Sequence, residues 1–499
     1  MGQTAIVVGA GFAGLSAASS LAQKGFQVKI LEKNAQAGGR ARAFKHKGFH
    51  FDMGPSWYWM PDVFEAYFQT FGKKVSDYYQ LDRLDPSYRV YFGSNDFVDL
   101  PAGTEAVIQL FEKIEKGSGA KLKKFIQDSA YKYEVGINDL VYKPGRSLLE
   151  FADWRIARGL IQLDLLKSMR RYVQAHFKNP RLQQIMEFPI LFLGATPQNT
   201  PALYSLMNYA DIDGGTWFPR GGMYEIVKAM VAVAEEQGVE ILCNQEVISA
   251  KFKGDQIIGL QTNQAYFEAD VILNAADYHH FEQEILPKEF RQYSPKYWET
   301  RAMAPSSLLF YLAVDKKVPG LLHHTLFFDE DFDQHAREIY ESPQWPSKPL
   351  FYVSATSKTD SAAAPEGQEN LFLLMPLAPG LKDDAEQREK YYHLMMDRLE
   401  AHIGAEIRPH VHFKRSYAMQ DFKNDYHAFK GNAYGLANTL SQTAILKPSL
   451  KSKKVANLYY AGQLTTPGPG VPPSLISGLV AAAEIEKDTL KNRRHESIV

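Results

Sequence analysis

Residues 4–14 read TAIVVGAGFAG, and this stretch decides which fold the chain is expected to have. Residues 4–8 of this stretch form a short apolar run, which is typical of a strand buried on both faces in a parallel sheet. Residues 9–14 form the glycine turn that follows it. An Ala- and Ser-rich helical stretch follows at 15–24, and a second apolar strand at 28–31 ends at Glu32. Strand, glycine turn, helix, strand and terminal carboxylate together predict a βαβ unit that binds a dinucleotide.

Each of the conspicuous residues in this unit has an expected task. Gly9 makes the tight turn, Gly11 lets the backbone approach a pyrophosphate, and Gly14 permits close packing of the helix on the strand. The free N–H groups at the start of the helix favour the anion. Glu32 is expected to accept hydrogen bonds from ribose hydroxyls.

The βαβ unit alone fits NAD as well as FAD, but the residues after it favour FAD. Residues 38–41 read GGRA and return glycine backbone and a guanidinium toward the same pyrophosphate. The planar fork of Arg40 suits bidentate phosphate contact. Residues 51–57, FDMGPSW, then form another turn that carries polar and aromatic groups.

A second glycine-rich segment lies near the end of the chain. Residues 457–462, NLYYAG, predict a short strand, and residues 467–474, PGPGVPPS, predict a rigid, non-helical turn. A helix is expected to begin near 472–474 and to continue through 475–486, with its positive dipole end facing the turn. In flavoenzymes of this architecture such a helix end points at the isoalloxazine, where negative charge develops when a hydride is accepted.

The middle of the chain predicts a second domain, because residues 60–240 interrupt the nucleotide fold before strands at 238–250 and 256–261 resume it. The apolar stretches 308–312 and 371–375 predict buried strands of a second, mostly antiparallel sheet. Between residues 165 and 178, apolar side chains recur at helical spacing. The opposite face carries Lys167, Arg170, Arg171 and Lys178, which suit anionic lipid headgroups or, equally, a solvated helix face.

Composition excludes several other classes of protein. The chain has 499 residues, 45 % of them apolar, and a net charge of −1, which is too balanced for a nucleic-acid partner. Its single cysteine excludes an internal disulfide and thiolate metal clusters, and the histidines form no metal-binding spacing, so no metal is expected. No stretch reaches the roughly 18 consecutive apolar residues of a membrane span, and no secretory signal is expected.

Taken together, the two glycine-rich ends resemble those of the bacterial-type phytoene desaturase family of carotenoid flavoenzymes. Residues 217–223 (WFPRGGM), 431–436 (GNAYGL) and 442–443 (QT) resemble the family too, and the likeness runs from about residue 4 to 487. It implies an α/β fold with a Rossmann-like FAD-binding domain of the glutathione-reductase and amine-oxidase type, formed by 1–60, 238–300 and 450–499. It also implies an inserted substrate-binding domain of mixed sheet with a helical, membrane-facing part, formed by 61–237 and 301–449.

The resemblance also implies which residues bind FAD. Those near the ADP half and its approach to the flavin would be Gly9, Gly11, Ala13, Gly14, Glu32, Lys33, Gly39, Arg40, Ser56 and Trp57. Those over the adenine and nucleotide would be Val247, Asn274, Ala275 and Ala276, and those at the isoalloxazine Gly462, Val471 and Pro472. Thr466 departs from the family, many members of which have His there, so an imidazole base is not available at that point.

The activity implied is FAD-dependent desaturation of a linear polyene, phytoene toward neurosporene or lycopene. A hydride leaves one allylic carbon for the flavin and the neighbouring proton is lost, either to water or to Asp153, for which helix capping or a surface ion pair is the alternative role. Oxygen or a membrane quinone would reoxidise the flavin, on a cytoplasmic protein bound peripherally to the inner face of the cell membrane. The alternatives are a later step such as 3,4-desaturation of a hydroxylated carotenoid, oxidation of a soluble amine, and a flavin-free isoprenoid carrier.

Overall fold

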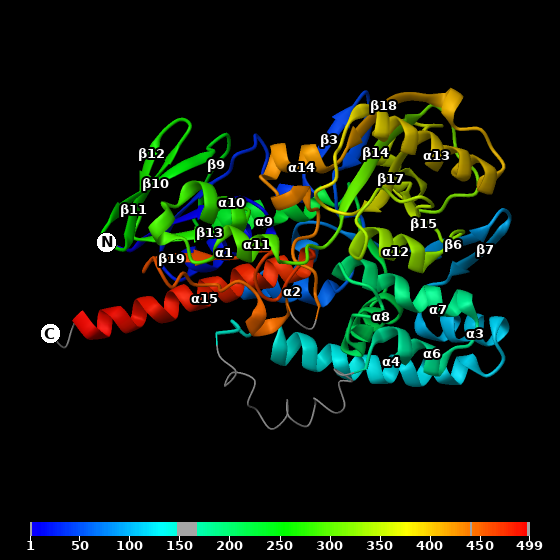
Figure 1. The fold of residues 1–499 in the computed structure, drawn as a ribbon, viewed down its shortest axis with the longest axis horizontal. Coiled ribbons are helices and arrows are strands. Elements are labelled where there is room, and N and C mark those ends of the chain that lie inside the picture. Colours follow the sequence, from blue (N-terminus) through cyan, green and yellow to red (C-terminus); the bar gives the residue numbers. More distant parts are fainter. Residues whose placement is uncertain (1, 147–166, 440–441, 497–499) are drawn as a thin grey trace.

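The computed structural model describes residues 2–146, 167–439 and 442–496 (Figure 1). Its first sheet has five parallel strands in the order β19-β13-β1-β2-β9. The strands are β1 (Thr4–Val8), β2 (Gln27–Leu31), β9 (Glu240–Leu242), β13 (Val271–Asn274) and β19 (Leu458–Tyr460). Three distant parts of the chain therefore build one sheet, and the predicted Rossmann-like α/β fold is confirmed.

The central strand β1 is apolar throughout because both of its faces are covered. Ala5 and Val7 share a core with the helices α1 (Phe12–Gln23), α9 (Tyr224–Glu236) and α15 (Val471–Glu496). Ile6 and Val8 share a separate core with a small antiparallel sheet on the opposite face. The strands of that small sheet are β10 (Val247–Lys253), β11 (Gln256–Thr262) and β12 (Tyr266–Glu268).

Helices α1 and α15 cross at very short range, which joins the two ends of the chain. A Cβ added at Gly478 of α15 would lie 2.1 Å from Ser16 Oγ and 2.2 Å from the carbonyl oxygen of Ala13. Ser16 Oγ donates a hydrogen bond of 2.8 Å to the carbonyl of Leu475. The crossing therefore depends on the missing side chain at Gly478.

Helix α15 begins at Val471, one residue before the predicted start near 472–474. Part of the expected rigid turn, Val471–Ser474, forms its first turn. The prediction that residues 467–474 are wholly non-helical was wrong, because the first N–H groups of a helix make no intrahelical hydrogen bond and proline lacks only that group. Pro472 and Pro473 therefore fit at these positions.

The second sheet has seven strands in the order β18-β14-β17-β16-β15-β6-β7, all antiparallel except for the β15–β6 pair. The strands are β6 (Tyr88–Gly93), β7 (Asp96–Leu100), β14 (Ser306–Val314), β15 (His324–Phe327), β16 (Phe351–Ser354), β17 (Glu369–Leu377) and β18 (Val411–Tyr417). One face packs on α13 (Ala385–Ile403) and forms a separate core. The expected strands at 308–312 and 371–375 are thus confirmed as neighbours in a mostly antiparallel sheet.

Helices form the remaining part of the middle region and lie below the seven-stranded sheet in Figure 1. They are α3 (Thr104–Ile114), α4 (Ser118–Val135), α6 (Met169–His176), α7 (Pro180–Glu187) and α8 (Leu206–Ile212). Helix α12 (Phe332–Tyr340) joins this part to the sheet, and α14 (Met419–Tyr426) joins the sheet to the nucleotide fold. Over the described ranges, no helix is both long and apolar enough to cross a bilayer.

The predicted basic helix face is only partly present. Within the described part of that stretch, α6 begins at Met169, and Arg170 does not point to solvent. Its guanidinium pairs with Glu187, whose side chain is 3 % exposed, and with Asp333 of α12. The assignment of Arg170 to a lipid-facing surface was therefore wrong, because two carboxylates draw it inward, whereas Lys167, Arg171 and Lys178 are exposed.

Two helices from the segment assigned to the substrate domain pack on the nucleotide fold instead. Helix α9 packs against α1. Tyr67 of α2 (Pro61–Thr70) donates a hydrogen bond to Ser19 of α1. We propose that α2 and α9 belong with the FAD-binding domain.

We expect Gly478→Ala to lower the free energy of unfolding by about 1–3 kcal/mol, because the new methyl group must displace α15 from α1. Thermal unfolding with excess FAD measures this effect. Ala483→Ser, at an exposed position of the same helix, should change the midpoint little. Equal midpoints for Gly478→Ala and the parent protein would contradict the dependence of the helix crossing on this glycine.

Candidate functional site

A single cavity of about 440 Å³ is lined by residues of the parallel sheet and by residues of the seven-stranded sheet. It gathers most of the residues that the sequence predicts for a cofactor site. Those lining it are Gly9, Gly11, Ala13, Glu32, Lys33, Gly39, Arg40, Ser56, Trp57, Val247, Asn274, Ala275, Ala276, Gly462, Val471 and Pro472. The two glycine-rich ends of the chain therefore meet at one site.

One predicted site residue, Gly14, does not line the cavity, and another lies outside the described residues. Gly14 lies behind the turn, where a Cβ would come within 1.9 Å of the carbonyl oxygen of Gly9. Its lack of a side chain permits the close packing of helix on strand, so its assignment as a ligand contact is corrected to this supporting role. Asp153 lies outside the described residues.

Glu32 connects the glycine turn to the loop after β2 through hydrogen bonds in the nucleotide half. One carboxylate oxygen accepts a hydrogen bond of 2.8 Å from the backbone N–H of Ala10, in the glycine turn. The other accepts bonds from the backbone and side-chain N–H groups of Asn34. A carboxylate has about four acceptor positions, so Glu32 can also accept from a ribose hydroxyl.

The glycine turn leaves space and N–H donors for an anion. The N–H groups in the first turn of any helix have no intrahelical acceptor. Helix α1 also has no side-chain cap at Gly11, so no capping side chain accepts from them there. A Cβ placed at Gly11 would meet no atom within 4 Å. The backbone at this point borders open space, as approach by a pyrophosphate requires.

Buried polar atoms in the segments beside the glycine turn also lack a hydrogen-bond partner. Within the described chain, Arg40 Nε and Asn274 Nδ2 are buried without a hydrogen bond. Arg40 Nη2 donates a single long bond, 3.3 Å, to the carbonyl of Asn432. Burial lowers the pKa of Arg40, while Tyr426 and Asp277 oppose that shift. A buried N–H group without a hydrogen-bond partner is costly, and the phosphates of FAD would satisfy the one at Arg40 Nε.

Asp277 lies in the same half of the cavity and was not predicted. Burial raises its pKa to about 6. Its oxygens accept hydrogen bonds from the backbone N–H groups of His280 and Phe429. Only its place just beyond the end of β13 could have signalled it, because the carboxyl ends of parallel strands meet at the ligand-binding edge.

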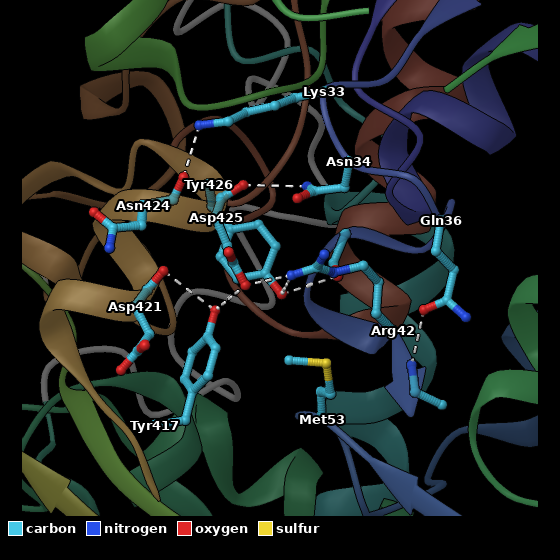
Figure 2. A network of polar contacts seen from close by, with 12 residues as sticks. Lys33, Asn34, Gln36, Arg42, Met53, Tyr417, Asp421, Asn424, Asp425 and Tyr426 are labelled. Atoms are coloured by element: carbon cyan, nitrogen blue, oxygen red, sulfur yellow. Dashed lines mark hydrogen bonds and ion pairs between the residues drawn. The ribbon is translucent and has the colours of Figure 1, made fainter. Parts of the chain in front are cut away.

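Residues from α14 close the nucleotide half, as Figure 2 shows. Arg42 pairs with Asp425 and donates to Tyr426 Oη at 3.2 Å. Asn34 donates to the backbone carbonyl of Asp425 at 3.1 Å, and Lys33 Nζ to that of Asn424 at 2.7 Å. No sequence motif marks α14, so its contribution was missed.

The other half of the cavity is apolar, and its floor is one face of the seven-stranded sheet. Leu309, Leu374, Tyr352 and Leu326 pair across β14, β17, β16 and β15, and all four line the cavity. Further apolar lining side chains are Trp59, Phe188, Met207, Phe328, Phe332, Ile339, Leu350 and Phe372. This half offers shape and dispersion contacts rather than charge.

His335 of α12 also lines the apolar half, but its ring nitrogens are both engaged. Nδ1 accepts a hydrogen bond of 3.0 Å from the backbone N–H of Leu350, so Nε2 carries the proton and lies 3.1 Å from the carbonyl of Pro376. Burial lowers its pKa to about 4. His335 is therefore a neutral structural group that joins α12 to the sheet.

Taken together, the residues present fit FAD. The turn at Gly11 has space and donors for a pyrophosphate, Arg40 and Asn274 have unpartnered buried atoms, and Glu32 has spare acceptor capacity. Val471 and Pro472 bring the N-terminal end of α15 to the junction of the two halves. Its dipole favours negative charge on a ring system bound there.

Comparisons with known proteins agree with this geometry. A family model described as flavin containing amine oxidoreductase matches residues 12–486. A carotenoid 3,4-desaturase of Haloarcula japonica is 41% identical over 490 residues, which cover 98% of this chain and 99% of the relative. A zeta-carotene-forming phytoene desaturase of Myxococcus xanthus is 31% identical over 487 residues, which cover 95% and 92%.

Among solved structures, cyclohexylamine oxidase from Brevibacterium oxydans superimposes with a TM-score of 0.60. The alignment covers 98% of this chain and 100% of that chain, with 14% sequence identity. At that identity the likeness concerns the fold alone.

We expect Arg40→Met to weaken FAD binding roughly 10- to 100-fold, because it removes charge-assisted hydrogen bonds to phosphate. Titration of FAD into flavin-stripped protein, followed by flavin fluorescence, gives the dissociation constant. Arg83→Met, which removes an exposed guanidinium that does not line the cavity, is the matched control. Unchanged affinity in Arg40→Met would remove Arg40 from the phosphate site.

Proposed function

The chain belongs to the flavin-containing amine oxidoreductase family and, within it, to the carotenoid desaturases, and from this we propose that it introduces carbon–carbon double bonds into a linear carotenoid. The observation that carries the proposal is the cavity of about 440 Å³, which joins a nucleotide half to an apolar half. A polyene offers no hydrogen-bonding group along its reacting length, so its recognition depends on apolar shape. The bound FAD supplies the hydride acceptor for such an oxidation.

The distribution of charge argues against oxidation of a soluble amine. The carboxylates that line the cavity in the described ranges are Glu32, Glu246, Asp277 and Asp425, and all four lie in the nucleotide half. The apolar half thus presents no carboxylate to a substrate ammonium group. Its aromatic walls would instead exclude water and align an extended hydrocarbon, which is the positioning task of this reaction.

Among the described residues that line the apolar half of the cavity, we assign none as the acceptor of the proton that the substrate loses after the hydride. His335 is engaged through both nitrogens. Asp153 stays a prediction, with helix capping or a surface ion pair as its alternative role. An allylic cation is acidic enough to release its proton to water, so desaturation needs no dedicated base.

Two desaturation steps remain as candidates. The family resemblance put phytoene first, toward neurosporene or lycopene, and 3,4-desaturation of a hydroxylated carotenoid second, but the two steps share every sequence motif described above. The 41% identity with a 3,4-desaturase, against 31% with a phytoene desaturase, favours the second. We therefore propose carotenoid desaturation as the activity, with 3,4-desaturation as the preferred step.

Expression in two carotenoid-accumulating hosts tests this proposal. A host that accumulates a hydroxylated acyclic carotenoid should gain a product with one further conjugated double bond, seen as a red shift in its absorption, whereas a phytoene-accumulating host should stay colourless. Red pigment in the phytoene host would instead support the first step. No new product in either host, with a purified protein that binds no flavin, would favour the non-enzymatic carrier.

We further propose that the protein works at the cytoplasmic face of the cell membrane and that oxygen or a membrane quinone reoxidises its flavin. The substrate is soluble only in the bilayer, so a peripheral enzyme must collect it there. Lys167, Arg171 and Lys178 are exposed next to α6 and could bind anionic headgroups.

Co-sedimentation with liposomes tests the membrane contact. Lys167→Glu/Arg171→Glu should reduce binding to anionic vesicles by roughly 30-fold or more, because each basic residue contributes about 1 kcal/mol near such a surface. Lys253→Glu/Lys288→Glu, the same charge change at exposed positions near the small sheet, should bind as the parent does. Equal pelleting of both double variants would remove α6 from the membrane contact.

A further inference from the structure

Three polar side chains interrupt the apolar half of the cavity near the nucleotide half. Tyr352 Oη lies 3.1 Å from Ser56 Oγ and 2.5 Å from His324 Nδ1. Ser56 and Tyr352 line the cavity, and His324 lies fully buried behind them. The His324 ring stacks on Trp57, with centroids 4.0 Å apart and an interplanar angle of 10°. We call Ser56, Tyr352 and His324 the Ser56 relay.

The relay lies at the boundary between the two halves. Ser56 follows Gly54, which packs so closely on Arg40 that a Cβ there would be 2.4 Å from the Arg40 carbonyl oxygen. On the other side, Tyr352 belongs to the leucine row of the sheet floor. A ligand atom at Ser56 therefore meets the apolar half where that half joins the nucleotide half.

Ser56 has hydrogen-bonding capacity to spare. A serine hydroxyl can donate one hydrogen bond and accept two. Across the described chain, the Ser56 side chain makes a single hydrogen bond, the one to Tyr352. Either Tyr352 or His324 can carry the proton that they share, and in both cases the Ser56 hydroxyl keeps hydrogen-bonding capacity for a ligand in the cavity that Ser56 lines.

The partners of Ser56 fix it in place. Tyr352 and His324 are both well buried, and burial raises the pKa of Tyr352 and lowers that of His324, so both stay neutral. The pair therefore orients Ser56 without adding a charge. A neutral, oriented hydroxyl at the edge of an apolar chamber suits a neutral polar group of a ligand.

We propose that Ser56, oriented by Tyr352 and His324, is a specificity-determining residue that binds a hydroxyl group carried by the polyene. This inference rests on the proposed function and deepens it by naming the residue that recognises the hydroxyl of a hydroxylated acyclic carotenoid. A substrate hydroxyl both donates and accepts, so it pairs with Ser56 in either proton arrangement. A plain hydrocarbon would leave Ser56 desolvated and unpaired, which is the basis of discrimination at polar sites.

A binding experiment on the FAD-loaded protein tests the proposal without relying on turnover. The probes are a hydroxylated acyclic carotenoid and the acyclic carotenoid of equal length and conjugation that lacks the hydroxyl. Quenching of tryptophan fluorescence reports binding, because Trp57 and Trp59 line the cavity. We expect the parent to bind the hydroxylated polyene about tenfold more tightly, the effect of one hydrogen bond to an otherwise unpaired buried group.

Ser56→Ala and Tyr352→Phe should each abolish that preference, and the FAD absorption spectrum of each variant reports whether the substitution also affects the cofactor. Tyr392→Phe, which removes the hydroxyl of a buried tyrosine on α13 that does not line the cavity, should keep the preference. A parent that binds both polyenes equally, or variants that keep the preference, would overturn the inference. A shifted flavin spectrum in Ser56→Ala with the preference intact would also overturn it, by assigning Ser56 to the cofactor.

Turnover assays on the same samples separate this inference from the proposed function. If the parent prefers the hydroxylated polyene in binding but desaturates neither polyene, the proposed activity fails while the Ser56 relay stands. If the parent desaturates both with equal kcat/KM and equal affinity, the activity stands and the relay has no role in specificity.

Discussion

The contact between α1 and α15 is the constraint on which the rest of the structure depends. Gly478 removes the side chain that would otherwise separate the two helices, and Ser16 ties them through the carbonyl of Leu475. Because of this crossing, the first turn of α15 reaches the glycine turn that precedes α1. The cofactor half of the cavity is thus made from the two ends of the chain, which also supply β1 and β19 to one parallel sheet.

The remaining walls come from the middle of the chain, and charged contacts hold them to the nucleotide fold. Arg42 and Lys33, which follow β2, bind the end of α14 through Asp425 and Asn424 (Figure 2). The same helix places Tyr426 beneath Arg40, with the guanidinium carbon 5.0 Å from the ring centroid. Helix α14 therefore joins the middle of the chain to the nucleotide fold directly beside Arg40, the residue expected to bind the phosphates. Movement of α14 would affect both the nucleotide half and the apolar half of the cavity.

The sequence was most informative where local spacing decides the structure. The positions of Gly9, Glu32 and Arg40 follow from one βαβ unit and the loop after it, and all three line the cavity. Tyr352 could not be found in this way, because its orientation depends on strand register with Leu374, far away in the chain. Arg170 was misjudged for the same reason: helical periodicity places it on a polar face, but only the tertiary fold brings Glu187 and Asp333 to it.

The hydrogen bond from the Leu350 N–H to His335 Nδ1, which attaches α12 to the sheet, does not depend on pH over the ordinary range. As long as Nδ1 stays unprotonated, it can receive the Leu350 N–H and keep α12 seated on the sheet. Since burial depresses the pKa of this imidazole to about 4, Nδ1 keeps its acceptor role from neutral pH down to distinctly acidic solution. The attachment of α12 to the sheet through this one hydrogen bond is thereby independent of ordinary changes in proton concentration.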